Sequence, residues 1–279
     1  MDCAAMNMSE VRDVLRSLGV RADKRFGQHF LVDERIAHRQ VEFAAIRRDE
    51  RVLEIGPGLG VLTRILSEKS RNVIAIEKDR RFCRFLESEV PDARIIEGDA
   101  LKVDLPRFDV VVSNLPYEIS SPITFRLLEN EFDRAVLMFQ KEFADRMVAK
   151  RGGEGYSRLS VHVYYRALAE VIERVPRSAF YPQPDVDSSI LSLKPRKPPF
   201  KVRDERLFSN MVDRMFQHRR KTVENGLSLT WQEFAASREA IKKAVESSGF
   251  GGMRPEELEP EQMGILADEL WAAQRTYPV

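Results

Sequence analysis

A turn with the pattern Gly56-x-Gly58-x-Gly60 separates a short apolar run at residues 52–55 from a segment with helical spacing at residues 61–69. Glycines at such a turn let the backbone approach a ligand closely, and the start of the following helix supplies amide donors. The spacing differs from the dinucleotide-binding pattern G-x-G-x-x-G. The turn therefore predicts a strand, a ligand-binding turn and a helix, without identifying the ligand.

Alternation of strands and helices continues beyond this unit. Further strands are predicted at residues 73–76, 94–96, 109–112, 135–139, 171–175 and 190–193. Strands that alternate with helices are typical of a mainly parallel sheet with helices on both faces. Only a loop, residues 176–189, separates the last two strands, so that pair is predicted to be antiparallel. We expect an α/β, Rossmann-like fold with a sheet of about seven strands.

The periodicity becomes purely helical after a linker rich in proline and basic residues, which includes Pro195, Pro198 and Pro199. Helices are predicted at residues 207–216, in a segment ending near 226, and at 237–247 and 261–273. We therefore divide the chain into residues 1–193, which hold the predicted sheet and its ligand-binding turn, and residues 194–279, a small all-helical domain.

The composition excludes several classes of protein. No apolar run approaches the roughly 20 residues that span a bilayer, so no membrane partner is expected. The N-terminus carries Asp2 and Glu10 and lacks an apolar core, which disfavours a signal peptide. The two cysteines, Cys3 and Cys83, do not have metal-binding spacing. We expect free thiols in the cytoplasm and no metal site.

Polar residues follow three successive strands of the predicted sheet, namely Glu77, Asp99 and Asn114. The carboxyl ends of parallel strands share one rim, where open α/β sheets bind ligands. Glu77 can accept both hydroxyls of a ribose, and Asp99 can receive the exocyclic amine of an adenine. Each acid alone fits an ordinary loop or helix cap equally well. Because they follow successive strands and meet at one rim, together they predict a site for a nucleoside cofactor.

The stretch Asn114-Leu115-Pro116-Tyr117 at the same rim suits an amino group on a planar ring. The N6 of adenine is a poor nucleophile because its lone pair is delocalised into the ring. The side-chain oxygen of Asn114 and the carbonyl of Leu115 can accept its two hydrogens. Pro116 fixes the turn and has no N–H to compete. Tyr117 can stack on the base, which contributes about 1–3 kcal/mol.

This acceptor stretch decides between two nucleoside cofactors. A dinucleotide and S-adenosylmethionine both present a ribose and an adenine to the two acids. A hydride-transfer enzyme has no use for an amide and a stacking ring at this rim, whereas an amino-methyltransferase does. We therefore predict a class I methyltransferase that uses S-adenosyl-L-methionine. Catalysis would rest on alignment and electrostatics, without a strong general base.

The chain resembles the ribosomal RNA adenine N6-dimethyltransferases of the small-subunit type, known in bacteria as the kasugamycin-resistance methylase. The matching motifs run almost from end to end. They are Lys24-Arg25-Phe26-Gly27-Gln28-His29-Phe30-Leu31, Leu53-Glu54-Ile55-Gly56-Pro57-Gly58-Leu59-Gly60, Glu97-Gly98-Asp99-Ala100, Asn114-Leu115-Pro116-Tyr117, Gln140-Lys141-Glu142, Phe180-x-Pro182-x-Pro184-x-Val186-x-Ser188, Phe216-Gln217-His218-Arg219-Arg220-Lys221-Thr222 and Arg254-Pro255-Glu256-Glu257-Leu258. The combination is highly specific, although each motif alone is not.

The resemblance implies roles for individual residues. Those implied to bind the cofactor are Gln28, His29, Leu31, Gly56, Gly58, Glu77, Asp99, Ala100 and Asn114. Those implied to meet the target base are Asn114, Leu115, Pro116, Tyr117 and Phe180. His29 stands where bacterial members usually carry asparagine and where archaeal and eukaryotic members often carry histidine. That difference favours an archaeal source and leaves the chemistry intact.

The resemblance also implies a substrate. Such an enzyme transfers two methyls to N6 of each of two adjacent adenines near the 3′ end of small-subunit rRNA. It acts on a pre-ribosomal particle as an assembly checkpoint, with no DNA partner. We expect a monomer in the cytoplasm.

Basic residues are gathered into runs although the net charge is only +1. The runs are residues 194–206, the cluster Arg219-Arg220-Lys221, and a group between residues 16 and 25. Singly, each run is more simply a solvated face. With the other nucleic-acid signals they indicate RNA binding, and Arg219, Arg220 and Lys221 are the candidate phosphate contacts.

Other functions stay open. The nearest rival is a large-subunit rRNA adenine methylase of the antibiotic-resistance type, which would share the acceptor stretch. A non-catalytic ribosome assembly factor, or a mitochondrial transcription factor on the same fold, would share the sheet. Intact Glu77, Asp99, Asn114 and Tyr117 argue for retained chemistry. A small-molecule methyltransferase would not explain the basic runs or the helical domain.

Overall fold

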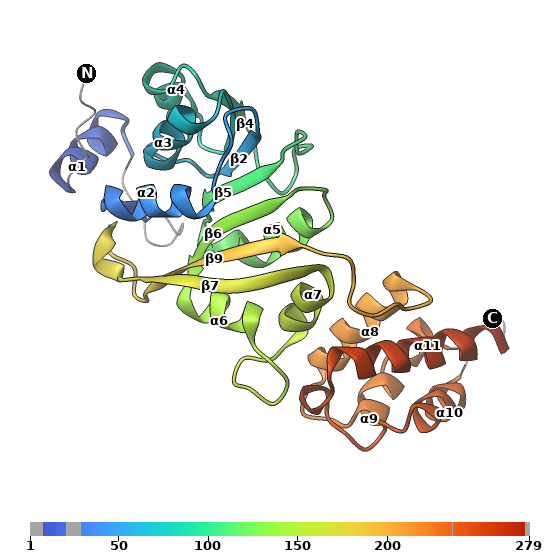
Figure 1. Ribbon diagram of the computed structural model, residues 1–279. Coiled ribbons are helices and arrows are strands. Elements are labelled where there is room, and N and C mark those ends of the chain that lie inside the picture. Colours follow the sequence, from blue (N-terminus) through green and yellow to red (C-terminus); the bar gives the residue numbers. More distant parts are fainter. Residues whose placement is uncertain (1–7, 21–28, 236, 277–279) are drawn as a thin grey trace. The chain divides into compact units, whose positions relative to one another are not determined.

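A computed structural model describes residues 8–20, 29–235 and 237–276. The chain forms two compact units, one of residues Met1–Ala144 with Leu168–Pro195 and one of residues Asp145–Ala167 with Arg196–Val279. The first contains the sheet and the second is helical (Figure 1). No helix in the described ranges is long and apolar enough to cross a bilayer.

The central sheet has seven strands, which confirms the predicted fold class. Their order is β4 (Arg94–Glu97), β3 (Asn72–Glu77), β2 (Arg51–Ile55), β5 (Val110–Asn114), β6 (Arg134–Gln140), β9 (Ser188–Pro195) and β7 (Ala167–Val175). Strands β4, β3, β2, β5 and β6 pair in parallel, and β9 is antiparallel to β6. The carboxyl ends of β3, β4 and β5 therefore lie on one rim, as the position of the polar residues requires.

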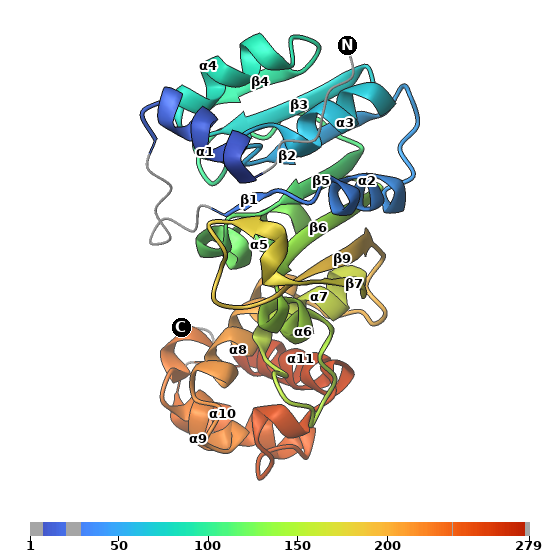
Figure 2. The same cartoon turned by 90° about the vertical axis from the view of Figure 1, so that its left-hand side faces the viewer.

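Helices cover both faces of this sheet. They are α2 (Glu34–Phe43), α3 (Val61–Lys69), α4 (Arg80–Glu89) and α5 (Ser120–Leu128). Figures 1 and 2 show α2 and α5 on opposite sides of β5 and β6. Helices α2 and α3 share one apolar core with alternate residues of the strands, including Val52 and Val112. The side chains of Asp33 and Asp79 accept the N–H groups that start α2 and α4.

A second, two-stranded sheet was not predicted. Strand β1 (Phe30–Leu31) pairs antiparallel with β8 (Phe180–Tyr181). Helix α1 (Met8–Ser17) packs nearby, because Val11 and Leu15 share an apolar cluster with Leu59, Phe82 and partly buried Phe30 (Figure 2). Two segments that each looked like a loop thus become a paired ribbon beside the glycine turn.

The helical unit holds α7 (Arg158–Arg166), α8 (Glu205–Gln217), α9 (Val223–Ser228), α10 (Arg238–Ser248) and α11 (Pro260–Thr276). Helix α6 (Lys141–Val148) begins in the sheet unit and ends in the helical one. Tyr156, Val161 and Tyr165 are buried in the same core as α8 to α11, and the Tyr156 hydroxyl donates to the Leu258 carbonyl at 3.0 Å. The expected division at residues 193 and 194 thus differs from the structure, because residues 145–167 bury their apolar face in the helical unit.

Candidate active site

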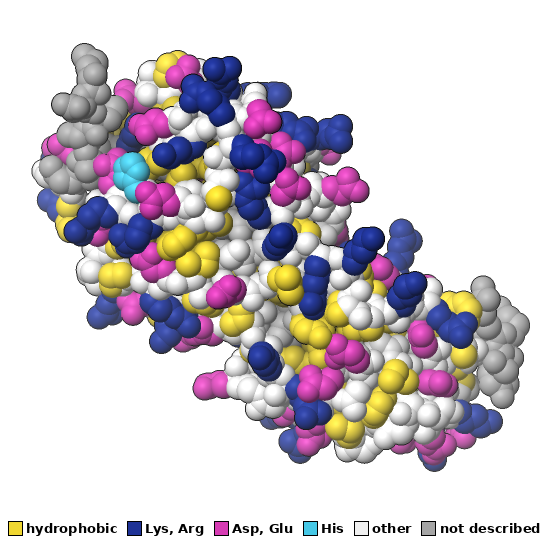
Figure 3. Space-filling view, in the orientation of Figure 1, with side chains coloured by type: hydrophobic (Ala, Val, Ile, Leu, Met, Phe, Trp, Pro, Cys, Tyr) yellow, Lys and Arg dark blue, Asp and Glu magenta, His cyan; other side chains and the backbone are white. Residues whose placement is uncertain are grey.

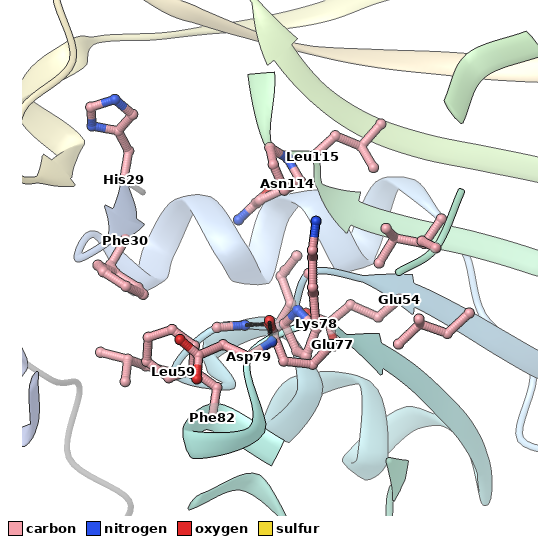
Figure 4. Close-up of a pocket in the computed structure, with 18 of the residues that line it drawn as sticks. His29, Phe30, Glu54, Leu59, Glu77, Lys78, Asp79, Phe82, Asn114 and Leu115 are labelled. Atoms are coloured by element: carbon pink, nitrogen blue, oxygen red, sulfur yellow. Dashed lines mark hydrogen bonds between the residues drawn. The ribbon is translucent and has the colours of Figure 1, made fainter. Parts of the chain in front are cut away.

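A cavity of about 700 Å³ lies at the carboxyl rim of the sheet, within the sheet unit (Figure 4). The glycine turn after β2, the ends of β3 and β5, and the ribbon of β1 and β8 all contribute to its lining. Twelve predicted site residues line it: His29, Leu31, Gly56, Gly58, Glu77, Asp99, Ala100, Asn114, Leu115, Pro116, Tyr117 and Phe180. Gln28 lies outside the described residues, and Arg219, Arg220 and Lys221 belong to the helical unit.

The glycine turn needs glycine for two reasons. Gly56 and Gly58 have φ of 68° and 56°, a region that side chains disfavour. A Cβ on Gly56 would lie 3.2 Å from Cγ of Pro116, and one on Gly58 would lie 3.2 Å from the ring of Phe30. The turn is therefore in close contact with both the acceptor stretch and the ribbon.

Glu77 is a buried carboxyl held by backbone amides. Its Oε2 accepts the N–H of Gly58 at 3.2 Å and its Oε1 accepts the N–H of Asp79 at 2.9 Å. Burial raises the pKa of Glu77, and these two hydrogen bonds oppose that rise. The carboxyl is thereby fixed on the cavity wall, where it can accept a pair of hydroxyls.

Asp99 is the half-buried acid of the site. Its Oδ1 accepts the N–H of Leu101 at 3.0 Å, and Nζ of Lys78 lies 3.3 Å from Oδ2. The hydrogen bond from Leu101 lowers the pKa of Asp99, and the interaction with Lys78 lowers it further. Lys78 also lines the cavity, although nothing in the sequence pattern had singled it out.

Asn114 ends β5 at the cavity wall. Its Oδ1 is buried, and among the described residues it has no hydrogen-bond partner. A buried polar atom without a partner costs roughly 1–3 kcal/mol, so such an atom calls for an explanation. A ligand that donates a hydrogen at this point would supply one.

Aromatic rings line the same cavity as Asn114. The Tyr117 hydroxyl and Oγ of Ser188 form a hydrogen bond of 2.7 Å, and burial raises the pKa of Tyr117. The ring of His29 lies 5.6 Å from that of Tyr117, centroid to centroid. Nδ1 of His29 donates to the carbonyl oxygen of Pro182 at 2.7 Å, which fixes the proton on that nitrogen because a carbonyl can only accept. Phe180 is buried and also lines the cavity.

Buried hydrogen bonds beneath the rim join the strands that carry these groups. Oγ of Ser113 donates to the Ile55 carbonyl at 2.5 Å and accepts the Ile55 N–H at 3.3 Å. Nε2 of Gln40 donates to the carbonyls of Ser113 and Val136 at 3.2 and 3.3 Å. Ser113, which precedes Asn114, is thus hydrogen-bonded to Ile55, which precedes the glycine turn. Ser113 interrupts an apolar run, and that interruption was the available sequence signal.

Glu54 was quoted only as part of a motif, yet it lines the cavity from within β2. Its side chain is 1% exposed, and its Oε2 has no hydrogen-bond partner in the described part of the chain. Burial raises the pKa of Glu54 to about 8, and the charge of Glu77 adds to the rise. The carboxyl is therefore mostly protonated at pH 7.

Arg126 of α5 fixes the loop that follows β4. Its Nη1 donates to the Ala100 carbonyl at 3.0 Å, and its Nη2 donates to the Val103 carbonyl at 2.5 Å. Ala100 lies next to Asp99, and α5 follows Tyr117 along the chain. Arg126 thus connects the two halves of the site over a sequence distance that no local pattern reveals.

Replacing Arg126 with methionine should weaken the binding of S-adenosylmethionine by up to about thirtyfold, because the loop that bears Asp99 loses two donors and each such bond contributes about 1 kcal/mol. Isothermal titration measures this affinity. The matched control is Arg84→Met, since Arg84 is exposed on α4. We expect the control to bind as the unaltered protein does, and equal affinity in both variants would remove Arg126 from this role.

Comparison with known proteins agrees with the family that the sequence motifs predict. The sequence model of the ribosomal RNA adenine dimethylase family matches residues 19–248. A probable ribosomal RNA small subunit methyltransferase A of Thermococcus gammatolerans is 44% identical over 252 residues, 90% of this chain and 90% of that protein. The crystal structure of a dimethyladenosine transferase from Plasmodium falciparum is 31% identical, with a TM-score of 0.73, and the match covers 85% of this chain and 95% of that one. The crystal structure of the 23S rRNA methyltransferase ErmE is 30% identical, with a TM-score of 0.64 over 86% of this chain and 99% of that one.

Proposed function

Because the chain belongs to the ribosomal RNA adenine dimethylase family, we propose that it dimethylates N6 of two adjacent adenines near the 3′ end of small-subunit rRNA. It is an S-adenosylmethionine-dependent methyltransferase that acts on adenine in rRNA. The observation that carries the proposal is Oδ1 of Asn114, which has no hydrogen-bond partner among the described residues and lies on the wall of a cavity also lined by Glu77 and Asp99.

The residues of the cavity fit the cofactor. Glu77 would hold the ribose hydroxyls, Asp99 would receive the adenine amine, and the turn at Gly56 and Gly58 would lie against the methionine end. Oε2 of Glu54, which has no hydrogen-bond partner in the described part of the chain, marks a second point on the wall where a donor of the cofactor would be received. S-adenosylmethionine supplies an electrophilic methyl carried on a sulfonium.

The acceptor stretch prepares the amine. Asn114 Oδ1 would accept one N6 hydrogen and the Leu115 carbonyl the other, which turns the lone pair of N6 toward the methyl. Tyr117 and Phe180 would hold the two faces of the base. The Tyr117 hydroxyl is bonded to Ser188 and its pKa is raised, so it is no base at neutral pH. None is needed, because the amine becomes acidic as its new bond forms and can release its proton to water.

The choice of the small subunit rests on the relatives. The site itself resembles that of enzymes on either subunit, since the large-subunit enzyme ErmE is 30% identical over most of the chain. Identity to a relative named as a small-subunit methyltransferase is 44%. The motifs at residues 219–222 and 254–256 of the helical unit also favour the small-subunit branch. We propose a monomer that acts on a pre-ribosomal particle in the cytoplasm.

A methylation assay tests this function. Purified protein and S-adenosylmethionine are incubated with small-subunit particles that lack the modification, and digested rRNA is analysed by mass spectrometry. We expect dimethyladenosine at two adjacent positions. Modification of large-subunit rRNA alone would mean that the protein is a large-subunit rRNA adenine methylase. Cofactor binding without any dimethyladenosine would favour an assembly factor without catalysis.

A further inference from the structure

The charge on the surface of this protein does not single out a new site on the face seen in Figure 3, where Lys and Arg side chains are interspersed with Asp and Glu. The buried contacts of the sheet unit are more informative, because one of them reaches a side chain that the proposed function uses. That side chain is Tyr117, whose ring would stack on the target base. The contacts that hold this ring are therefore part of the site.

The backbone alone does not fix the ring of Tyr117. The residue opens a short 3₁₀ helix, Tyr117–Ile119, in which the N–H of Ile119 donates to the Pro116 carbonyl at 3.1 Å. From such a position a tyrosine ring can still rotate about two side-chain bonds. The angle of a stacking ring matters, because a misplacement of about 1 Å in an active site can lower the rate by about a hundredfold. Contacts of the side chain itself therefore have to set this angle.

Ser188 holds the far end of the Tyr117 side chain. Its Oγ and the Tyr117 hydroxyl lie 2.7 Å apart, in a hydrogen bond between residues that are 71 positions apart in the chain. Ser188 is fully buried. Within the described ranges it is not one of the residues that line the cavity, and neither hydroxyl has a second hydrogen-bond partner. The side chain of Ser188 therefore reaches the site through Tyr117.

The position of Ser188 is itself fixed by the sheet. Ser188 is the first residue of β9 and pairs with Gln140, the last residue of β6. The N–H of Lys141 donates to the Asp187 carbonyl at 2.9 Å, and the side chain of Asp187 accepts the N–H of Arg177 at 2.9 Å. The backbone is thus hydrogen-bonded on both sides of the Ser188 side chain, and the hydroxyl is a fixed point for the Tyr117 ring.

A second ring lies beside Tyr117. The imidazole of His29 is 5.6 Å away, centroid to centroid, with the two ring planes at 32°. Nδ1 of His29 donates to the Pro182 carbonyl at 2.7 Å, so this neighbour is anchored as well. Tyr117 is therefore held at its hydroxyl by β9 and has an anchored ring beside its own.

We propose that Ser188 is a positioning residue for methyl transfer, which holds the Tyr117 ring at the angle in which it stacks on the target base. The proposal rests on the proposed function for the role of Tyr117. It divides the work of that side chain, because the ring meets the base and the hydroxyl fixes the ring. Tyr117→Phe keeps the stacking surface and removes the anchor, so it separates the two parts.

A double-mutant cycle tests this role. Methyl transfer to small-subunit particles that lack the modification is measured for Tyr117→Phe, for Ser188→Ala and for the variant with both changes. Each change removes the same hydrogen bond, so we expect the same loss of kcat in all three, about fivefold, which is the usual effect of one neutral hydrogen bond. Cofactor affinity and the KM for the particle should stay within about twofold, because Ser188 is not among the described residues that line the cavity.

The matched control is Ser189→Ala. Ser189 is the next residue of β9 and equally buried, and its Oγ accepts a hydrogen bond from Nη1 of Arg174 at 2.6 Å. Loss of either serine hydroxyl should lower the stability toward urea, but Ser189→Ala should keep a normal kcat. The control therefore distinguishes a general weakening of β9 from a loss that acts on Tyr117.

Three results would overturn the assignment: a normal kcat in Ser188→Ala, losses that multiply in the double variant, or an equal loss of kcat in Ser189→Ala. Tyr117→Ala separates this proposal from the one on which it rests. A normal rate in Tyr117→Ala would reject the role of Tyr117 in the proposed function. A large loss in Tyr117→Ala, with no change in Ser188→Ala, would reject the role of Ser188 alone.

Discussion

Replacing Asn114 with alanine is expected to reduce methyl transfer by at least a hundred- to a thousandfold, the usual effect of removing one preorganised hydrogen-bonding group from an active site. The side chain contributes a buried oxygen that has no partner in the described protein. Its removal therefore costs the folded state little, whereas the amine loses the acceptor that directs its lone pair. Transfer is measured as dimethyladenosine formed in small-subunit particles per unit time.

Two further measurements make that result specific. Affinity for the particle should remain within about twofold, because the change leaves the basic residues of the helical unit untouched. The matched control is Asn130→Ala, whose side chain is exposed and donates to the Arg126 carbonyl at 2.8 Å; its transfer rate should be normal. If Asn114→Ala lost particle binding together with transfer, the separation between catalytic cavity and docking surface would be wrong.

Replacing Glu54 with glutamine should remove a large pH dependence of stability. The pKa of Glu54 rises from 4.5 to about 8 in the folded state. The folded state then holds a proton that the unfolded state releases, so unfolding becomes easier as pH rises from about 4.5 to about 8. Stability from this group is fully present below pH 4.5. At 1.36 kcal/mol per pKa unit, the loss across that range is on the order of 5 kcal/mol.

The measurement is the free energy of unfolding by urea, at intervals from pH 5 to pH 9, for the unaltered protein without cofactor and for Glu54→Gln. We expect the variant to become progressively more stable than the unaltered protein as the pH rises. Other titrating groups cancel in this difference. Glu68→Gln, an exposed glutamate on α3, serves as the control and should follow the unaltered protein. If the free energies of unfolding of Glu54→Gln and of the unaltered protein changed in parallel with pH, the folded state would not disfavour the ionisation of Glu54.

Most of the sheet and its rim were predictable because local patterns encode them. Short apolar runs gave the strands, and the parallel order then placed Glu77, Asp99 and Asn114 on one edge without any knowledge of contacts. The bounds of α3 and the caps of α2 and α4 also follow from residues within a few positions of one another.

The remainder depends on contacts between distant segments. Strand β1 exists only because β8 pairs with it, and neither two-residue segment has a pattern of its own. The high pKa of Glu54 arises from burial, which its own motif does not reveal. The helix at Arg158–Arg166 was expected, but its apolar face could have been buried by either unit. The pairing of Arg219 with Glu256 likewise spans 37 residues.

The ribbon of β1 and β8 couples the part of the site proposed for the cofactor to the part proposed for the target base. Leu31, implied to cover the cofactor, is the pairing partner of Phe180, proposed to pack on the target base. A displacement of β1 would therefore be transmitted directly to β8. Spent cofactor has to be replaced before each further methyl is transferred, so an exchange that moves β1 would also move Phe180. We expect the base to be released between transfers, so that singly methylated adenines accumulate early in the reaction.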